Sequence, residues 1–377
     1  MIETPGVLLT VLAFGLVIGP LVFIHEMGHY LAARWFGVKA EAFSIGFGRE
    51  IAGWTDRRGT RWKLALLPLG GYVKFAGDMT AAGRSDPNWL LLPADERERT
   101  FQAKLVWQRA IIVAAGPAIN FVLAVLILAG FALAYGDAQT PAVVGQAMPG
   151  TAAAEAGLRA GDRIQALGGR DVATFEDMVR FVKIRAGERV RIEYVRAGEA
   201  RSVEARIGTQ EQRDRFGNEY KVGLLGIAPT SPVVRPVGLF EAPVVAVRRT
   251  GDILEMMVET IGQIVSGRRS VKELGGPLAI AKVSGEQITL GWDAFVFLLA
   301  LVSINLGFIN LLPVPMLDGG HLLFYLIEAI RRKPVGPEAQ EWAYRGGLAA
   351  VLALMLMVTF NDLGNFGLWR HLAGLIG

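Results

Sequence analysis

The sequence predicts a membrane protein that is mostly α-helical, with four transmembrane helices and one α+β domain outside the bilayer. The chain has 377 residues, of which 52% are hydrophobic and 20% are charged, and the two kinds are unevenly distributed. A helix needs about 20 apolar residues to cross a bilayer. Three charge-poor stretches meet that length, and a fourth, of about 15 residues, would cross with little tilt. The four stretches are 6–24, 110–135, 294–317 and 346–360.

The distribution of Lys and Arg predicts which side of the membrane each loop faces. Basic residues are frequent in 37–104 and recur at 331–345, whereas the two ends of the sequence carry almost none. Because cytoplasmic loops are enriched in Lys and Arg, we expect both of these loops on the cytoplasmic side. Both termini and the long loop 136–293 are then expected on the opposite side. The chain has no cysteine, so disulfides and thiolate metal ligands are excluded.

The first apolar stretch leads directly into His25-Glu26-Met27-Gly28-His29. It is interpreted as a retained helix rather than a signal peptide, since no basic residue precedes it and no small-residue cleavage site follows. H-E-x-x-H on a helix places two imidazoles on one face, which is the pattern that holds zinc beside a general base. The alternative is a chance match between satisfied core histidines, but ionisable groups at membrane depth are costly and usually functional.

Residues 43–76 are expected to form a small sheet, because aromatic and β-branched residues alternate with polar ones. Two interpretations remain open. The sheet is either a small cytoplasmic subdomain or an edge near the metal that binds an extended peptide through main-chain hydrogen bonds. In the second interpretation the peptide-binding residues are Tyr72, Val73, Lys74 and Phe75.

The second span contains Asn120, for which we favour a packing role, since a polar side chain inside a membrane must face protein. The region 141–229 is predicted to be a compact domain of strands, one helix that a Thr174 capping pattern opens, and a hairpin. The segment 240–267 is a long helix whose charges favour an interfacial or packed position over a span.

A catalytic zinc needs a third protein ligand and an open position. The candidate follows the third span, where two prolines stop the helix and two glycines follow Asp318. Asp318 is predicted to be the ligand, because an unpaired carboxylate at that depth would be costly whereas metal binding justifies it. His321 is the second choice. Glu41 and Glu50 are weaker candidates because both lie in the predicted sheet.

The roles of the other polar groups follow from this arrangement. Glu26 is predicted to be the general base, which takes a proton from zinc-bound water and passes it to the leaving amine. Asn310 would hydrogen-bond the substrate backbone or the developing oxyanion. Alternatively, Asn310 makes a helix–helix hydrogen bond within the bundle, and both interpretations remain open.

These motifs together resemble the bacterial site-2 proteases, the RseP-type zinc metalloproteases of peptidase family M50B. The match joins H-E-x-x-H with the segment from Asn310 to Gly320, and it extends over nearly the whole chain. The outer domain, with Gly157-Leu-Arg-Ala-Gly-Asp-Arg-Ile164, looks like the PDZ domain of that family. Shorter matches are 107–109, 115–121 and 275–282.

The resemblance implies a zinc protease of the bacterial inner membrane that cleaves single-span proteins within the bilayer. Its substrates would be an anti-sigma factor, after a first protease has removed the outer domain, and remnant signal peptides. The family's zinc ligands fall on His25, His29 and Asp318, its catalytic glutamate on Glu26, and its substrate-contacting asparagine on Asn310. The segment 43–76 would be a membrane-associated β-loop that pairs with substrate. Termini and PDZ domain would be periplasmic and the site would lie toward the cytoplasm.

The same resemblance gives a division of the chain. The best-known members of the family carry two PDZ domains, whereas this chain has room for one. This departure puts in doubt the role of a size filter, in which a double PDZ domain blocks substrates with bulky outer domains. The expected segments are a first transmembrane helix in 1–36, the β-loop region in 37–104, a second helix in 105–136, the PDZ domain in 137–230, an interfacial segment in 231–290, a third helix in 291–318, a cytoplasmic segment in 319–342, a fourth helix in 343–362 and a tail in 363–377.

Two other classes of protein predict different sequence features from those of a protease. A catalytically silent membrane scaffold with a PDZ domain predicts at least one broken ligand, and none is broken here. A metal permease predicts ionisable residues along several spans, whereas here they cluster on the first and third. The glycine-rich segment 44–48 lacks a nucleotide-binding pattern, so we expect no phosphate site there. A nucleic-acid partner is not expected either. The substrate and the PDZ ligand are not identified by the sequence.

Overall fold

The protein is described by a computed structural model that covers residues 5–78, 87–183, 185–213, 219–266 and 275–365. The chain divides into two compact units. The first comprises 1–128, 249–254 and 272–377, and the second comprises 129–248 and 255–271. Each unit is described by itself.

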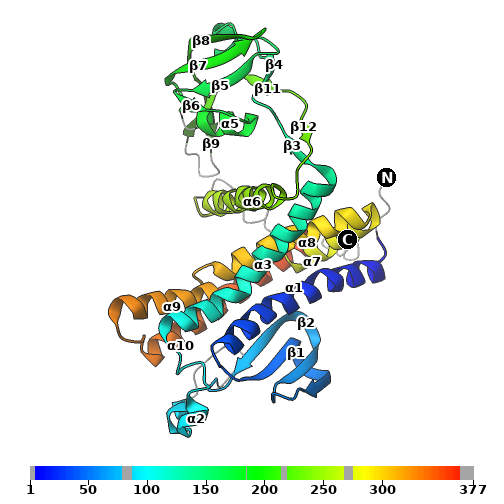
Figure 1. The fold of residues 1–377 in the computed structure, drawn as a ribbon, viewed down its shortest axis with the longest axis vertical. Coiled ribbons are helices and arrows are strands. Elements are labelled where there is room, and N and C mark those ends of the chain that lie inside the picture. Colours follow the sequence, from blue (N-terminus) through cyan, green and yellow to red (C-terminus); the bar gives the residue numbers. More distant parts are fainter. Residues whose placement is uncertain (1–4, 79–86, 184, 214–218, 267–274, 366–377) are drawn as a thin grey trace, which may run out of the picture. The chain divides into compact units, whose positions relative to one another are not determined.

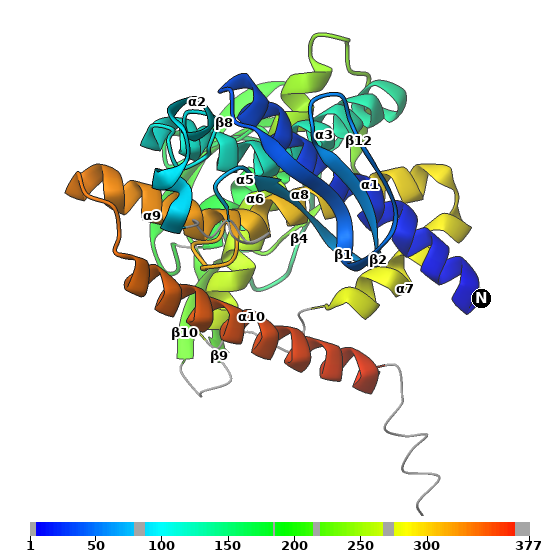
Figure 2. The same ribbon diagram turned by 90° about the horizontal axis from the view of Figure 1, so that it is seen from below.

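The first unit is built from long apolar helices (Figures 1 and 2). Among the described residues, four helices are long and apolar enough to cross a membrane, which agrees with the sequence prediction of a membrane protein. The candidate spans are Val7–Trp35, Val106–Tyr135, Trp292–Leu311 and Glu338–Phe360. The described helices of eight residues or more that include residues of this unit are α1 (Val7–Trp35), α3 (Val106–Tyr135), α6 (Ala242–Val265), α7 (Pro277–Leu290), α8 (Trp292–Leu311), α9 (Asp318–Arg331) and α10 (Pro337–Asn365).

Glycines allow the helices of this unit to approach closely. A Cβ on Gly28 of α1 would collide with the carbonyl oxygen of Ala115 in α3. A Cβ on Gly307 of α8 would lie 3.1 Å from the carbonyl oxygen of Pro117, also in α3. Small residues at such contacts bring helix backbones together in membranes, where no hydrophobic force drives helix association. Helix α3 therefore contacts both α1 and α8.

The predicted sheet is present beside α1, as Figures 1 and 2 show. It consists of β1 (Ala40–Thr55) and β2 (Arg61–Phe75). Residues 42–45 of β1 pair with 61–64 on one side and with 71–74 on the other. The segment 71–75 has no second strand partner among the described residues, so it forms an edge of the sheet. A short 3-10 helix, η1 (Pro87–Leu91), and α2 (Ala94–Arg97) follow.

Several helix boundaries differ from the sequence prediction. Helix α8 ends at Leu311 rather than at 318, because Pro313 and Pro315 cannot continue it. The segment expected as a cytoplasmic connection in 319–342 is largely the helix α9, and α10 begins at Pro337 rather than at 343. The turn before α9 places Met316 at a φ of 90°, a conformation that L-residues rarely adopt.

The second unit contains a four-stranded antiparallel sheet with the order β6-β5-β7-β8. The capping box predicted at Thr174 is confirmed, since its Oγ1 accepts the Asp177 N–H at 3.2 Å and Asp177 Oδ2 accepts the Thr174 N–H at 3.0 Å. The elements are β3 (Asp137–Gln139), β4 (Val144–Ala147), α4 (Ala152–Glu155), β5 (Arg163–Leu167), β6 (Arg170–Asp171), α5 (Phe175–Lys183), β7 (Arg189–Arg196), β8 (Glu199–Arg206), β9 (Gly208–Arg213), β10 (Glu219–Leu224), β11 (Ile227–Pro229) and β12 (Val233–Arg235).

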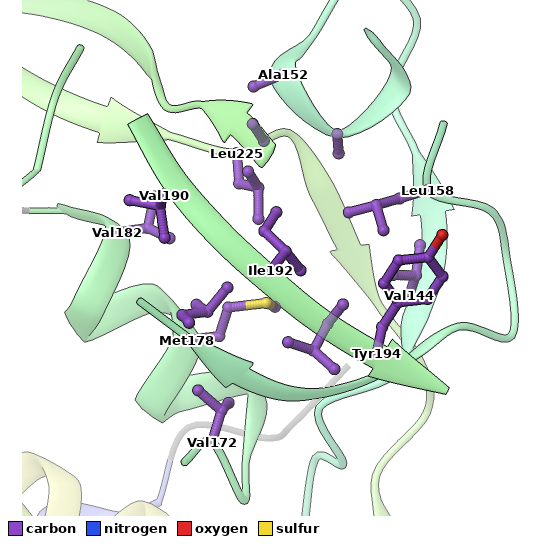
Figure 3. Close-up of a cluster of buried hydrophobic side chains, with 14 of the residues drawn as sticks. Val144, Ala152, Leu158, Val172, Met178, Val182, Val190, Ile192, Tyr194 and Leu225 are labelled. Carbon is purple, nitrogen blue, oxygen red and sulfur yellow. The ribbon is translucent and has the colours of Figure 1, made fainter. Parts of the chain in front are cut away.

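The core of this unit lies between α5 and the sheet. Met178 of α5 and Ile192 of β7 are 2% and 1% exposed, and Figure 3 shows their side chains directed toward one another. The predicted hairpin is confirmed by the regular pairing of β7 with β8. Alternating buried residues on β7, Val190, Ile192 and Tyr194, supply one face of this core.

One buried ion pair holds the loop before β5. Asp162 is 1% exposed and accepts hydrogen bonds from Arg196 Nε and from the Arg159 N–H, both at 2.7 Å. Desolvation raises the pKa of the Asp162 carboxyl, but these hydrogen bonds outweigh it and hold the pKa below its usual value. A lowered pKa contributes stability at neutral pH, which is lost as the pH falls through that value.

We therefore expect Asp162→Ala to destabilise this unit by at least about 4 °C in Tm, because a guanidinium and an N–H lose their acceptor. Thermal unfolding of the full chain in detergent, with hydrogen exchange measured in β5 and β7, tests this expectation. Asp171→Ala, at an exposed position on β6, is the matched control. Equal exchange protection in the two variants at pH 7 would contradict the assigned role of Asp162.

Candidate metal centre

His25, His29 and Asp318 converge from two helices. The histidines lie one turn apart on α1, and Asp318 is the first residue of α9. The Oδ2 atom of Asp318 lies 3.3 Å from His25 Nε2 and 3.4 Å from His29 Nε2, and the two Nε2 atoms are 3.3 Å apart. These three are the residues that the sequence predicts as ligands, and the structure brings them together.

Each histidine is oriented through its other ring nitrogen. His29 Nδ1 lies 2.9 Å from the carbonyl oxygen of Ile112, which can only accept, so Nδ1 carries the proton and Nε2 is left as a lone-pair donor. His25 Nδ1 lies 3.1 Å from the Asn120 side-chain amide. The Ile112 carbonyl fixes the tautomer and the ring orientation of His29, and the Asn120 amide orients the ring of His25. Gly116 leaves room for the His29 ring, since any Cβ there would collide with it.

The chemistry of these donors fits zinc. The Oδ2 atom of Asp318 is buried and makes no hydrogen bond to any part of the chain that the structure describes. Buried carboxylate oxygens are rarely left in that state, and a cation between the three atoms would satisfy it. Two imidazole nitrogens and one carboxylate form a three-ligand set of the kind found in catalytic zinc sites. These residues would therefore hold the ion.

Glu26 lies beside this donor set without contributing to it. It is 8% exposed, and its carboxylate lies beside the backbone N–H of Val73 in β2. Gly71 allows this contact, because a Cβ there would lie 2.9 Å from Glu26 Cγ. The sheet edge that the sequence predicts therefore meets the predicted base directly.

A cavity of about 230 Å³ opens at this point. Among the predicted substrate-binding residues, Tyr72, Val73 and Phe75 line it, whereas Lys74 pairs with Glu41 at 2.9 Å. The lining residues are His25, Glu26, His29, Gly71, Tyr72, Val73, Phe75, Asp78, Phe101, Val113, Asn310, Met316, Asp318, His321 and Tyr325.

The remaining candidates occupy different positions around the site. Asn310 lines the cavity and donates through Nδ2 to the Leu306 carbonyl of its own helix at 3.0 Å, which is neither of the hydrogen bonds considered from the sequence. His321, the second-choice ligand, lines the cavity and its Nδ1 lies 3.1 Å from the Tyr344 hydroxyl. Glu50 pairs with Arg61 and does not line the cavity.

Sequence reasoning missed two polar residues near the site. Asn120, which we interpreted as a packing residue, contacts the His25 ring. The sequence does indicate that the Asn120 side chain needs a polar partner, because an amide inside a span is costly. It does not indicate that this partner is His25. Asp78 lies in the segment that follows β2, is 5% exposed, and accepts hydrogen bonds from the Phe75 N–H at 3.3 Å and from Gln102 Nε2 at 2.5 Å.

Burial raises the pKa of Asp78 to about 7, although the hydrogen bonds from Gln102 and from the Phe75 N–H oppose the shift. Of the charged groups nearby, Glu41 raises this pKa and Lys74 lowers it. A raised pKa contributes stability that is fully present at pH values below about 4, the pKa of an unfolded Asp, and is lost as the pH rises through 7.

We expect the wild type to lose about 3 kcal/mol of stability relative to Asp78→Asn between pH 5 and pH 8, because the amide cannot ionise. Thermal or denaturant unfolding of both proteins in detergent across that range measures the difference. If the two proteins show parallel pH profiles, the Asp78 carboxyl does not titrate in this range.

Two histidines, an aspartate and an adjacent glutamate, buried among apolar helices, are the residues of a metal-dependent hydrolase in a membrane protein. The comparisons with known proteins agree with this class. The chain belongs to peptidase family M50, whose family model matches residues 13–354. Zinc-dependent proteolysis is therefore its class of activity.

The relatives of the chain carry metalloprotease names. It is 46% identical over 360 residues to "Putative zinc metalloprotease Atu1380" of Agrobacterium fabrum, with 94% of this chain and 96% of that protein covered. It is 36% identical over 396 residues to "Metalloprotease MmpA" of Caulobacter vibrioides, with 98% and 99% covered. Among solved structures, the PDZ domain of an SdrC-like protein from Listeria monocytogenes matches 23% of this chain and 85% of that chain, with 19% identity and a TM-score of 0.19, which carries no argument about the fold.

Proposed function

We propose that this protein is an intramembrane endopeptidase that cleaves single-span membrane proteins within the bilayer. The observation that carries the proposal is the position of the donor set. His25 and His29 lie within a candidate span, and the cavity beside them is bordered by a sheet edge. Peptidase chemistry at that position acts on a substrate segment that enters from the membrane.

Each side chain has a distinct role in the proposed reaction. Zinc held by His25, His29 and Asp318 would supply Lewis-acid chemistry and lower the pKa of water. Glu26 takes the proton of the attacking water and delivers it to the leaving amine. Because its side chain lies against Gly71 and beside the Val73 N–H, Glu26 is positioned at the edge where the substrate backbone would lie.

The edge segment 71–75 is proposed to bind the substrate as an added strand. It pairs with β1 on one side, and all of its residues except Lys74 border the cavity. An extended peptide placed there gains main-chain hydrogen bonds and presents its carbonyls to the site. A transmembrane helix must unwind before it can bind in this way, since helical N–H and C=O groups are already paired. Asn310 is proposed to bind the substrate backbone after it exchanges its bond to Leu306.

Physiological substrates and orientation belong to the same proposal. We infer a multi-pass protein of the bacterial inner membrane with both termini and the PDZ domain in the periplasm, supported by the distribution of Lys and Arg. The substrates would be an anti-sigma factor that has already lost its outer domain, and remnant signal peptides. The domain in 137–230 is proposed to be a single PDZ domain.

Purified protein and a single-span reporter in the same liposomes test this proposal. Mass spectrometry of the products should place the cut within the apolar segment of the reporter. A zinc chelator should remove activity and added zinc should restore it. The proposal fails if the products end outside the apolar segment, or if cleavage persists at full rate in the chelated protein.

A further inference from the structure

Val73 and Phe75 of the edge strand at the cavity direct their backbone amides away from β1. The Val73 N–H lies beside the Glu26 carboxylate, and the Phe75 N–H donates to Asp78 Oδ2 at 3.3 Å. Residues two apart on a strand direct their N–H groups to the same edge. Both of these amides therefore face carboxylates that line the cavity, and that of Phe75 is hydrogen-bonded to its carboxylate.

The two carboxylates are held differently. Glu26 is positioned beside the donor set, where the proposed reaction requires it to exchange protons. Asp78 is fixed from two further directions. Its backbone N–H donates to the Phe75 carbonyl at 3.1 Å, and its Oδ1 accepts Gln102 Nε2 at 2.5 Å. Asp78 therefore closes a tight loop on Phe75 and occupies that amide.

This loop is also sterically closed. Gly77 has a φ of 90°, and a Cβ there would collide with Gln102 Oε1 and lie 3.0 Å from Thr100 Cβ. The Phe101 N–H donates to the Ala76 carbonyl at 3.2 Å, which ties the loop to the segment before α3. A peptide added to the edge therefore finds the amide of Val73 within reach, whereas the amide of Phe75 is already occupied.

We propose that Asp78 is a register stop for the substrate: it ends the pairing edge at Phe75 and thereby fixes which peptide bond of the substrate lies at Glu26. This inference rests on the proposed function, because it requires a peptide added as a strand. The register of strand pairing is otherwise weakly set, since a shift by two residues keeps every side chain on its own face. Asp78 is thus a specificity-determining and positioning residue that acts through the Phe75 amide.

Removing the stop should add a second cleavage site. In Asp78→Ala the Phe75 N–H is free to pair with substrate, so a register two residues from the wild-type register gains a hydrogen bond. One net hydrogen bond corresponds to about a 5-fold change in the ratio of the two products. Asp78→Asn keeps an acceptor oxygen in place and should cut at the wild-type bond. Asp78→Ser is a second variant, because its side chain is too short to reach the Phe75 amide. Its hydroxyl suits the polar surroundings of this position better than a methyl group does.

The experiment maps the cut in one single-span reporter by product mass, using the full-length zinc-loaded protein and each variant in liposomes. The expected result is one cut for wild type and Asp78→Asn, with a further product displaced by two residues for Asp78→Ala and Asp78→Ser. A purely structural role for Asp78 predicts lower stability and an unchanged cut, and that result would overturn the proposal. A shifted cut in Asp78→Asn would also overturn it. Failure of the proposed function is distinguished because wild type itself would then show no zinc-dependent product.

Discussion

Replacing Glu26 by Gln is expected to abolish peptide cleavage while leaving the zinc content unchanged. The amide keeps the size of the side chain and fits the same place beside Val73, but it cannot take a proton from water. General base catalysis contributes about 10²–10⁴-fold to such reactions, so the rate should fall at least by that factor. Cleavage of a single-span reporter, measured beside elemental analysis of the same preparation, gives both quantities.

A matched glutamate separates this effect from a general loss of function. Glu286 lies on α7, where it pairs with Lys282 at 3.8 Å, and it does not line the cavity. Glu286→Gln should therefore cleave at the wild-type rate. If Glu26→Gln retains full activity, Glu26 is not the base, whatever its position beside the donor set.

Asp318→Ala is expected to remove both zinc and activity. The variant loses one of three donors and leaves two neutral imidazoles, which bind zinc much more weakly. Loss of a partner that only orients a ligand costs about 10–100-fold in metal affinity, and loss of the ligand itself should cost more. Competition titration with a zinc-binding dye measures the affinity of the wild type and the variant.

The same titration on Asn120→Ala gives an internal scale, since this residue contacts His25 without being a candidate ligand. We expect its affinity to fall between those of wild type and Asp318→Ala. An Asp318→Ala affinity equal to that of wild type would remove Asp318 from the site. Asp171→Ala, in the other unit, controls for the loss of an acidic side chain as such.

The parts of the site that could be predicted are those in which a residue, at its position in the sequence, has a single plausible function. The spacing of His25 and His29 predicts a shared helix face, and helix α1 has it. Asp318, although far along the chain, was found because an acid after a proline-stopped apolar helix needs a compensating partner. The contact between the edge strand and Glu26 was anticipated as a sheet near the metal, although the sequence left this interpretation open.

The other parts depend on tertiary contacts that leave no such pattern. The acceptor for His29 is a backbone carbonyl, that of Ile112, and every residue has one. Asn120 could either pack between helices or orient the ring of a metal ligand. The sequence does not separate these roles, because an amide inside a span requires a polar partner in both. Asp78 follows a turn glycine, where an acid is ordinary, and only the folded loop brings it to the Phe75 amide.

The zinc content of purified wild type, Glu26→Gln and Asp318→Ala, determined together by elemental analysis, tests the central claim most directly. The claim is that two histidines of α1 and the first residue of α9 form one metal centre, with Glu26 beside it but not bound to it. We predict about one zinc per chain in wild type and Glu26→Gln, and loss of zinc in Asp318→Ala. Wild-type zinc in Asp318→Ala, or loss of zinc in Glu26→Gln, would contradict the account.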